Sequence, residues 1–137
     1  DLLDAQFTAL NGGALGWEAS SPDRHGIQAR IFHLDPITGK RPPGTLERLV
    51  LPDDIEVGIG LDEGTRADSD TEPLVVKLTV TAPTRQAAIV RMKAALEHTR
   101  VEGISTNLEV LQRLFGHPDL WSEGGKVSTL RDLVNTS

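Results

Sequence analysis

The sequence predicts an α+β domain in which an antiparallel β-sheet is flanked by helices. Two stretches, 24–36 and 74–82, alternate apolar and polar residues with the period of two that is typical of strands. After residue 83 the apolar residues recur at the spacing of three and four that is typical of helices. Neighbouring strands with short links favour antiparallel pairing, and helices that follow a run of strands indicate the α+β class.

The composition limits the kinds of protein to consider. The chain has 137 residues, which suits one domain, with 38% apolar and 25% charged residues. The net charge is −6 and there is no block of lysine and arginine, which argues against a nucleic-acid partner. The apolar runs are far shorter than a membrane span. Cysteine is absent, which excludes disulfides and thiol chemistry and fits a reducing compartment.

The chain opens with DLLDAQFTALNGG, whose apolar residues form a helical stripe over residues 2–10. Asn11-Gly12 is the predicted end of this helix. A helix that begins at residue 1, with apolar residues in its first turn, suggests a piece of a longer chain. Residues 12–23 contain many turn-forming residues, so we expect a linker there.

The next predicted strand places Ile27, Ala29 and Ile31 on one face and Gln28 and Arg30 on the other. A loop follows, because the prolines of DPITGKRPPG forbid regular structure. Two more strands are expected, over 45–52 and 55–61. In the second, the apolar residues Ile55, Val57, Ile59 and Leu61 are expected to face inward.

A turn at 62–64 and a polar loop over 65–73 lead to the clearest strand, 74–82. Its residues Leu74, Val76, Leu78 and Val80 are expected in the core. A helix should begin after Thr84, and a short strand at 101–104 should follow it. Thr106 or Asn107 can cap a further helix that ends at Gly116, and a last short helix is predicted over 128–134.

Most of the residues that suggest chemistry have simpler explanations. Gly58, Gly60 and Gly64 do not have the GxGxxG spacing, and no helix follows, so we interpret them as strand and turn residues. The carboxylates lie in predicted loops and lack the spacing of a calcium loop. The histidines share no metal-like spacing; they are His25, His33, His98 and His117. The residues therefore predict neither a metal site nor a cofactor site.

Arg30 is the unusual residue, because it lies in the middle of a strand. A strand holds a guanidinium more rigidly than a loop does, which suits orientation of an anion by paired N–H bonds. On the residues alone, a structural ion pair is the favoured interpretation of Arg30. Lys77 is the charged residue of the strand 74–82, and we expect its stem to snorkel toward water.

The order of short motifs along the chain resembles the C-terminal lobe of the biotin carboxylase component of biotin-dependent carboxylases. RHGIQARIFHLDP resembles the family pattern Gly-His-Ala-x-Glu-x-Arg-Ile-x-x-Glu-Asp-Pro, and RPPG is similar to the Pro-x-Pro-Gly turn that follows. TEPLVVK, RQAAIVRMKAAL and GISTN resemble the next three family motifs in the same order. The opening DLLDAQ resembles the family helix Asp-Leu-Val-x-x-Gln.

The resemblance covers almost the whole chain and implies one domain over 1–137, preceded in the parent protein by an ATP-grasp region. The family uses ATP and bicarbonate to carboxylate N1′ of biotin, which is carried on a separate carrier domain. By resemblance, Arg30 is the catalytic residue of this piece and helps to hold the ureido oxygen of biotin. Gln28 lies on the same face and is a candidate for positioning the substrate. ATP and Mg²⁺ would be bound mainly by the absent region.

The implied partners are the ATP-grasp part of the same protein, the biotin carrier domain and a second copy of the chain, with no nucleic acid and no membrane. The implied compartment is the cytoplasm or an organelle matrix such as that of mitochondria. The excised chain is expected to be inactive alone. The acceptor is chosen by a carboxyltransferase region outside this chain.

The sequence also departs from the family pattern. Leu34 replaces the usual glutamate before Asp-Pro, and Thr71-Glu72 replaces Tyr-Asp. Glu56 stands where the family often has an arginine directed toward a dimer interface. These departures favour an alternative, in which the domain keeps the fold, has lost the chemistry and serves as a scaffold or interaction domain.

Overall fold

The computed structural model describes residues 15–21 and 24–116. The predicted helices over 2–10 and 128–134, and His117, lie outside the described residues. Within the described residues, no helix is both long and apolar enough to cross a membrane.

The described strands form one larger sheet and two small ones. In the order of their hydrogen bonding, the larger sheet consists of β1 (Leu15–Ser21), β2 (Arg24–Phe32), β7 (Leu74–Ala82) and β5 (Glu56–Ile59). The small sheets pair β3 (Gly44–Thr45) with β6 (Arg66–Ala67), and β4 (Arg48–Val50) with β8 (Arg100–Glu102). All of these pairs are antiparallel, which confirms the predicted fold class.

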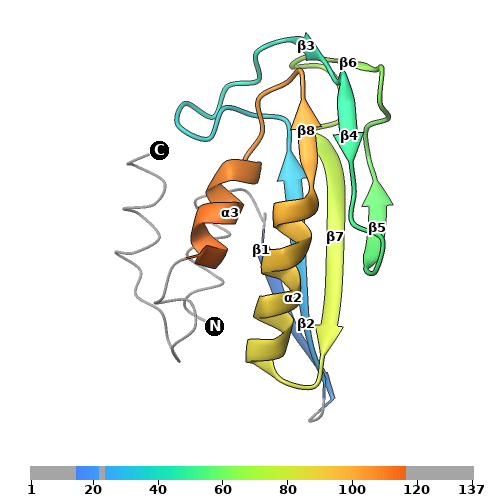
Figure 1. Ribbon diagram of the computed structural model, residues 1–137. Helices are drawn as coiled ribbons and strands as arrows, with labels where there is room; N and C mark the ends of the chain where they lie inside the picture. The colour runs from blue at the N-terminus through green and yellow to red at the C-terminus, as the bar shows by residue number, and fades with distance from the viewer. Residues whose placement is uncertain (1–14, 22–23, 117–137) are drawn as a thin grey trace.

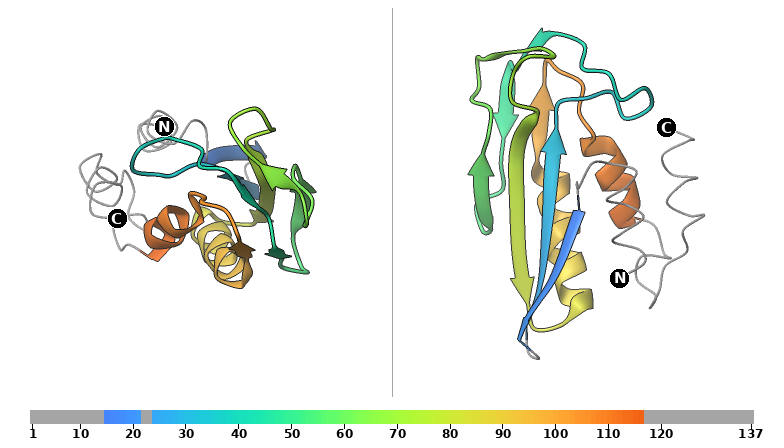
Figure 2. Two further views of the ribbon diagram at one scale, coloured as in Figure 1. Left: turned by 90° about the horizontal axis from the view of Figure 1, so that it is seen from above. Right: turned by 180° about the vertical axis from the view of Figure 1, so that it is seen from behind.

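The helices α2 (Arg85–His98) and α3 (Leu108–Gly116) lie on the same side of the larger sheet (Figures 1 and 2). The Thr84 hydroxyl accepts a hydrogen bond from the N–H of Ala87, as the predicted N-cap requires. At the other end of α2, His98 lies in the last turn, where a cation is favourable. The predicted helices after residue 83 are therefore confirmed within the described residues.

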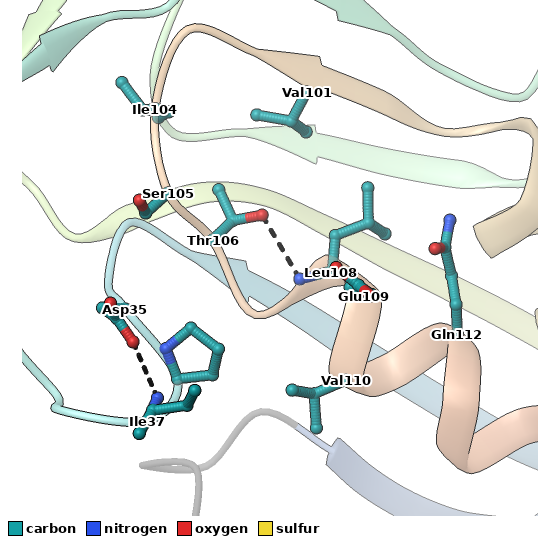
Figure 3. Close-up of a pocket in the computed structure, with 11 residues that line it drawn as sticks. Asp35, Ile37, Val101, Ile104, Ser105, Thr106, Leu108, Glu109, Val110 and Gln112 are labelled. Atoms are coloured by element: carbon teal, nitrogen blue, oxygen red, sulfur yellow. Dashed lines mark hydrogen bonds between the residues drawn. The ribbon is translucent and has the colours of Figure 1, made fainter. Parts of the chain in front are cut away.

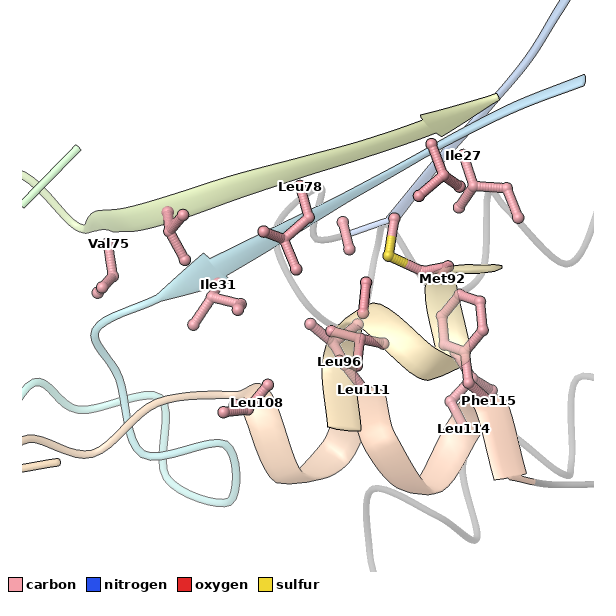
Figure 4. Close-up of a cluster of buried hydrophobic side chains, with 14 of the residues drawn as sticks. Ile27, Ile31, Val75, Leu78, Met92, Leu96, Leu108, Leu111, Leu114 and Phe115 are labelled. Atoms are coloured by element: carbon pink, nitrogen blue, oxygen red, sulfur yellow. The ribbon is translucent and has the colours of Figure 1, made fainter. Parts of the chain in front are cut away.

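The core fills the space between the sheet and the helices (Figure 4). The members with the largest buried side chains are Ile27, Ile31, Leu46, Leu78, Ile89, Met92, Leu96, Leu111, Leu114 and Phe115. The inward residues predicted for β2 and the helical stripe predicted for α2 are all in this cluster. Burial of this apolar surface is the main source of stability, at roughly 25 cal/mol per Å².

Five expectations are wrong. Leu74, predicted to face the core, is half-buried and outside the core cluster, because the register shift at Val75 interrupts the alternation of β7. Residues 15–21 form β1 and not a linker, because they pair with the edge of β2. The stretch 45–52 is divided between β3 and β4, which pair with different partners. The polar stretch 65–73 contains β6, and its Ala67 is fully buried. Ile59, predicted to face the core, is 54% exposed because it ends the edge strand β5.

A close contact between two glycines joins the small sheets. A Cβ at Gly44 would lie 2.6 Å from the carbonyl oxygen of Gly103. A Cβ at Gly103 would lie 2.0 Å from the carbonyl oxygen of Thr45, and the φ angle of Gly103 is +105°. Both positions therefore need glycine, for space and, at Gly103, also for backbone conformation. This contact fixes the chain that leads from β8 into α3.

Candidate functional site

The larger sheet has one face turned away from α2 and α3, here called the polar face, which carries Gln28, Arg30, Lys77 and Thr79. Seen from behind, the sheet lies in front of α2 (Figure 2). Along β2 the buried residues Ala29 and Ile31 alternate with half-buried Gln28 and Arg30. The predicted division of β2 into a core face and a polar face is confirmed, although this does not test a role for either polar residue.

Arg30 lies directly opposite Lys77 in the pairing of β2 with β7. Residues opposite each other in an antiparallel pair have side chains on the same face, so two cations are neighbours on the polar face. Like charges in such positions repel each other, and an anion between them would remove the repulsion. Lys77 was expected only to snorkel, because the sequence did not give the register that places it beside Arg30.

On its other side, Lys77 lies opposite Gly58 of β5. A Cβ at Gly58 would lie 3.5 Å from Cε of Lys77, so the stem of the lysine lies over the bare glycine. In the next row of the polar face, Gln28 is opposite Thr79, which is in turn opposite Glu56. On the polar face, the row of Arg30 and Lys77 therefore lies beside a row that contains the amide of Gln28, the hydroxyl of Thr79 and the carboxylate of Glu56.

Two features border the segment of β2 that carries Arg30. On one side the pairing with β7 shifts register between Ile31 and Phe32, which leaves Val75 as an extra residue of β7. On the other side the described part of β1 ends at Leu15, opposite Ala29. Beyond that point, the side-chain amide of Asn107 bonds to the backbone of β2 at Arg30 and Phe32. The sequence predicted Asn107 only as one of two candidate caps.

The other residues considered from the sequence have structural surroundings. Gly58 lies in β5, Gly64 has a φ of +91°, and a Cβ at Gly60 would lie 2.3 Å from the carbonyl oxygen of Leu74. Their interpretation as strand and turn residues is confirmed.

The described histidines lie on separate elements. His33 is fully buried, and its Nε2 is 2.8 Å from the carbonyl oxygen of Pro42. His98 contacts the carbonyl oxygen of Ala94 at the end of α2, and His25 is half-buried in β2. Within residues 15–21 and 24–116, no three side chains of the types His, Cys, Asp or Glu are grouped as a metal ion would require.

A cleft of about 620 Å³ opens between the loop after β2 and the start of α3 (Figure 3). Asp35 and Glu109 line it together with apolar residues such as Ile37 and Leu108, and the described part of its lining contains no lysine or arginine. The Asp35 carboxylate accepts hydrogen bonds from the backbone N–H groups of Ile37 and Thr38. This cleft does not favour an anion, and Arg30 is not among the residues that line it.

A second cleft, of about 610 Å³, lies between α2 and the loop before β5. Its arginine, Arg91, donates to the carbonyl oxygens of Thr81 and Asp54 at 2.5 and 3.0 Å. Because this guanidinium joins three backbone segments, its role in the described structure is to tie the ends of the sheet and helix together. Of the two clefts and the polar face, the polar face is the better place for an anionic group.

Comparison with known proteins gives the same family from sequence and from structure. The family model described as biotin carboxylase C-terminal domain matches residues 28–132. The chain is 38% identical over 96 residues to a biotin carboxylase of Halalkalibacterium halodurans, covering 69% of this chain and 21% of that protein. It is 34% identical over 117 residues to biotin carboxylase 2 of Bacillus subtilis, covering 81% of this chain and 26% of that protein.

Among solved structures, the chain is similar to the biotin carboxylase domain of 2-oxoglutarate carboxylase from Hydrogenobacter thermophilus. The TM-score is 0.71 at 28% identity, covering 82% of this chain and 26% of that chain. That domain was crystallised as a dimer in complex with MgADP, ADP and bicarbonate. The present chain therefore spans about a fifth to a quarter of the length of the two bacterial relatives and of this structure.

Proposed function

Because the chain belongs to the biotin carboxylase C-terminal domain family, we propose that residues 1–137 are the C-terminal lobe of a biotin carboxylase within a larger biotin-dependent carboxylase. The short span of the chain relative to its relatives supports a parent protein with further regions. In this proposal an ATP-grasp region precedes the lobe, and the lobe alone is inactive. The two parts together carboxylate biotin with ATP and bicarbonate.

The observation that best supports this proposal is the position of Arg30 directly opposite Lys77 on the polar face. Removal of the N1′ proton of biotin places negative charge on the ureido oxygen. A guanidinium fixed by sheet backbone stabilises that charge where it develops, an effect typically of a few kcal/mol. Arg30 suits the role because arginine stays protonated and its donors are held in a plane. Lys77, opposite Arg30, adds a second positive charge to the same place.

Gln28 is proposed to position the substrate. It is two residues before Arg30 on the same strand and is half-buried on the polar face. Its side chain can donate and accept hydrogen bonds, so it suits a neutral polar group beside the charged oxygen. The neighbouring Thr79 extends the same row of hydrogen-bonding groups.

The cofactors in this proposal are biotin on a carrier domain, and ATP with Mg²⁺. The proposal assigns ATP and Mg²⁺ mainly to the upstream region. The related domain crystallised with MgADP and bicarbonate is about four times longer than the part this chain matches, which leaves room for such a region.

The partners proposed for the lobe are the ATP-grasp part, the carrier domain and a second copy of the parent. The related 2-oxoglutarate carboxylase domain is a dimer, which supports the last of these. Exposed Glu56 on the edge strand β5 indicates that a dimer through β5 would use different contacts from those of the family. The compartment is proposed as the cytoplasm or an organelle matrix, since some relatives are mitochondrial methylcrotonoyl-CoA carboxylase subunits.

The second candidate function is a scaffold or interaction domain that has lost the chemistry. Leu34 favours it, because the family has a glutamate at that position beside the arginine strand. Leu34 is half-buried, and its backbone N–H donates to the carbonyl oxygen of Ser105. A leucine here keeps this backbone hydrogen bond, as other residues would, but supplies no carboxylate.

An Arg30→Ala variant of the full-length parent protein distinguishes these functions. We expect the biotin-dependent rate of ATP cleavage to fall by about 10²–10³-fold, because one preorganised charge contact is lost. Arg48→Ala is the matched control, since Arg48 pairs with Glu102 at 3.7 Å on the surface and its side chain is 63% exposed. This control should keep the rate of the unmodified protein. An unmodified parent without biotin-dependent turnover, or a fully active Arg30→Ala variant, would contradict a catalytic lobe that acts through Arg30.

A further inference from the structure

The side chain of Asn107 connects the start of α3 to the strand that carries Arg30. Asn107 is fully buried. Its Oδ1 accepts a hydrogen bond from the backbone N–H of Phe32 at 2.7 Å. Its Nδ2 donates to the backbone carbonyl oxygen of Arg30 at 3.1 Å. One side-chain amide therefore makes the pair of bonds that the backbone of a neighbouring strand would make.

This use of an asparagine differs from its usual role at the start of a helix. The backbone carbonyl oxygen of Asn107 accepts from the N–H of Leu111, which places Asn107 at the N-cap of α3. An N-cap asparagine normally bonds to the first N–H groups of its own helix. Here the hydroxyl of Thr106 accepts from the N–H of Leu108, and the amide of Asn107 bonds to β2.

The bonds lie beyond the described end of β1 on that edge of β2. The described part of β1 reaches only to the position opposite Ala29, so Asn107 continues the ladder over Arg30 and Phe32. On the opposite edge, the register shift after Ile31 interrupts regular pairing with β7. Without Asn107, the part-buried carbonyl group of Arg30 and the part-buried N–H group of Phe32 would lack these partners, which is unfavourable.

We propose that Asn107 is a positioning residue that fixes the backbone of Arg30 and so aims its guanidinium across the polar face. This inference rests on the proposed function of Arg30. Asn107 does not touch the substrate in this proposal. A displacement of about 1 Å at a reacting group can cost up to about 10²-fold in rate, so an anchor on this backbone segment has a measurable effect.

The test uses the full-length parent protein with free biotin. We expect Asn107→Ala to lower the biotin-dependent rate of ATP cleavage by about 10-fold, with the loss in kcat and not in the KM for ATP. ATP cleavage measured without biotin should stay within about twofold, which reports that the protein is folded. A merely structural defect would lower both rates together.

Gln112→Leu is the matched control, because Gln112 lies on the same helix and its side-chain amide also donates to a backbone carbonyl. Its acceptor is Leu96 at the end of α2, at 2.9 Å, and not β2. The control should lose a similar interaction between elements and keep the biotin-dependent rate. A loss equal to that of Asn107→Ala would overturn the inference, because any loosened α3 would then have the same effect.

A double variant shows whether Asn107 acts through Arg30. If it does, Arg30→Ala with Asn107→Ala should be no slower than Arg30→Ala alone, since the positioned group is already absent. If the fold loss of the double variant equals the product of the two single losses, the inference is overturned and the proposed function is left intact. If Arg30→Ala alone has no effect, it is the proposed function that fails, whatever the result at Asn107.

Asn107→Asp covers the case in which the alanine variant does not fold. A carboxylate keeps an acceptor for the N–H of Phe32 but cannot donate to the carbonyl oxygen of Arg30. We expect a loss of biotin-dependent rate of about threefold or more, with ATP cleavage without biotin unchanged. An aspartate variant with the full biotin-dependent rate would contradict the role of the bond to Arg30.

Discussion

The two faces of the larger sheet carry different kinds of side chain, although the same strands form both faces. Leu78 and Lys77 are neighbours in β7 and point in opposite directions. Leu78 is fully buried in the core beneath α2 and α3, whereas Lys77 is half-buried on the polar face beside Arg30. The core face is explained by burial of apolar surface, whereas the polar face gathers charged and hydrogen-bonding side chains that burial does not explain.

This difference predicts that substitutions on the two faces have separable effects. Changes on the core face should lower stability and reduce every activity in proportion to the folded fraction. Changes on the polar face should lower the biotin-dependent rate and leave stability nearly unchanged. The following variants, made in the full-length parent protein, test the comparison from the largest expected effect to the smallest.

Leu78→Ala should have the largest effect on stability. Removing a fully buried leucine side chain leaves a cavity and costs about 2–5 kcal/mol. Hydrogen–deuterium exchange of the backbone amides of β7 measures the loss of local stability. Val90→Ala on α2 is the matched control, because Val90 is 51% exposed and should change by less than about 0.5 kcal/mol. Similar protection of β7 in both variants would mean that the core face is not the source of stability.

Lys77→Met should lower the biotin-dependent rate of ATP cleavage by about 10-fold, which corresponds to about 1.4 kcal/mol. Methionine keeps the apolar stem over Gly58 and removes the charge beside Arg30. The melting temperature should not fall, because a like-charge contact is lost. Lys93→Met is the control, since Lys93 is also half-buried but belongs to α2 on the other side of the sheet. Equal rates for the two lysine variants would remove Lys77 from the proposed site.

Ile59→Thr should have the smallest effect. Ile59 ends the edge strand β5 and is 54% exposed, so its replacement should change stability by less than about 0.5 kcal/mol. Ile27→Thr, at a position that is 1% exposed, is the buried counterpart and should be clearly destabilised. Thermal unfolding of the two variants gives the comparison. A large loss for Ile59→Thr would show that another part of the parent protein covers the β5 edge.

Local patterns predicted the elements that build the core. The period-two alternation of β2 and β7 and the helical spacing of α2 and α3 depend only on nearby residues, so a single sequence contains them. The resemblance of ordered motifs predicted the family, which the comparisons confirm over residues 28–132. It also named Arg30 and Gln28, whose roles remain predictions.

Strand pairing accounts for the errors. Residues 15–21 become β1 only because the edge of β2 is available to pair with them. The stretch 45–52 is divided because β3 pairs with β6 and β4 pairs with β8. The partners of β3 and β4 lie tens of residues away along the chain, whereas β1 pairs with the adjacent strand β2, and strand propensity depends strongly on such partners.

The sequence by itself determined which residues of each strand and helix are apolar, and therefore which face of each element enters the core. Only the tertiary structure decided the register that places Lys77 beside Arg30 and the bonds that join Asn107 to β2. The physical reason is the range of the interactions. Side-chain periodicity is set by local backbone geometry, whereas register and side-chain hydrogen bonds are fixed by groups brought together only when the whole domain packs.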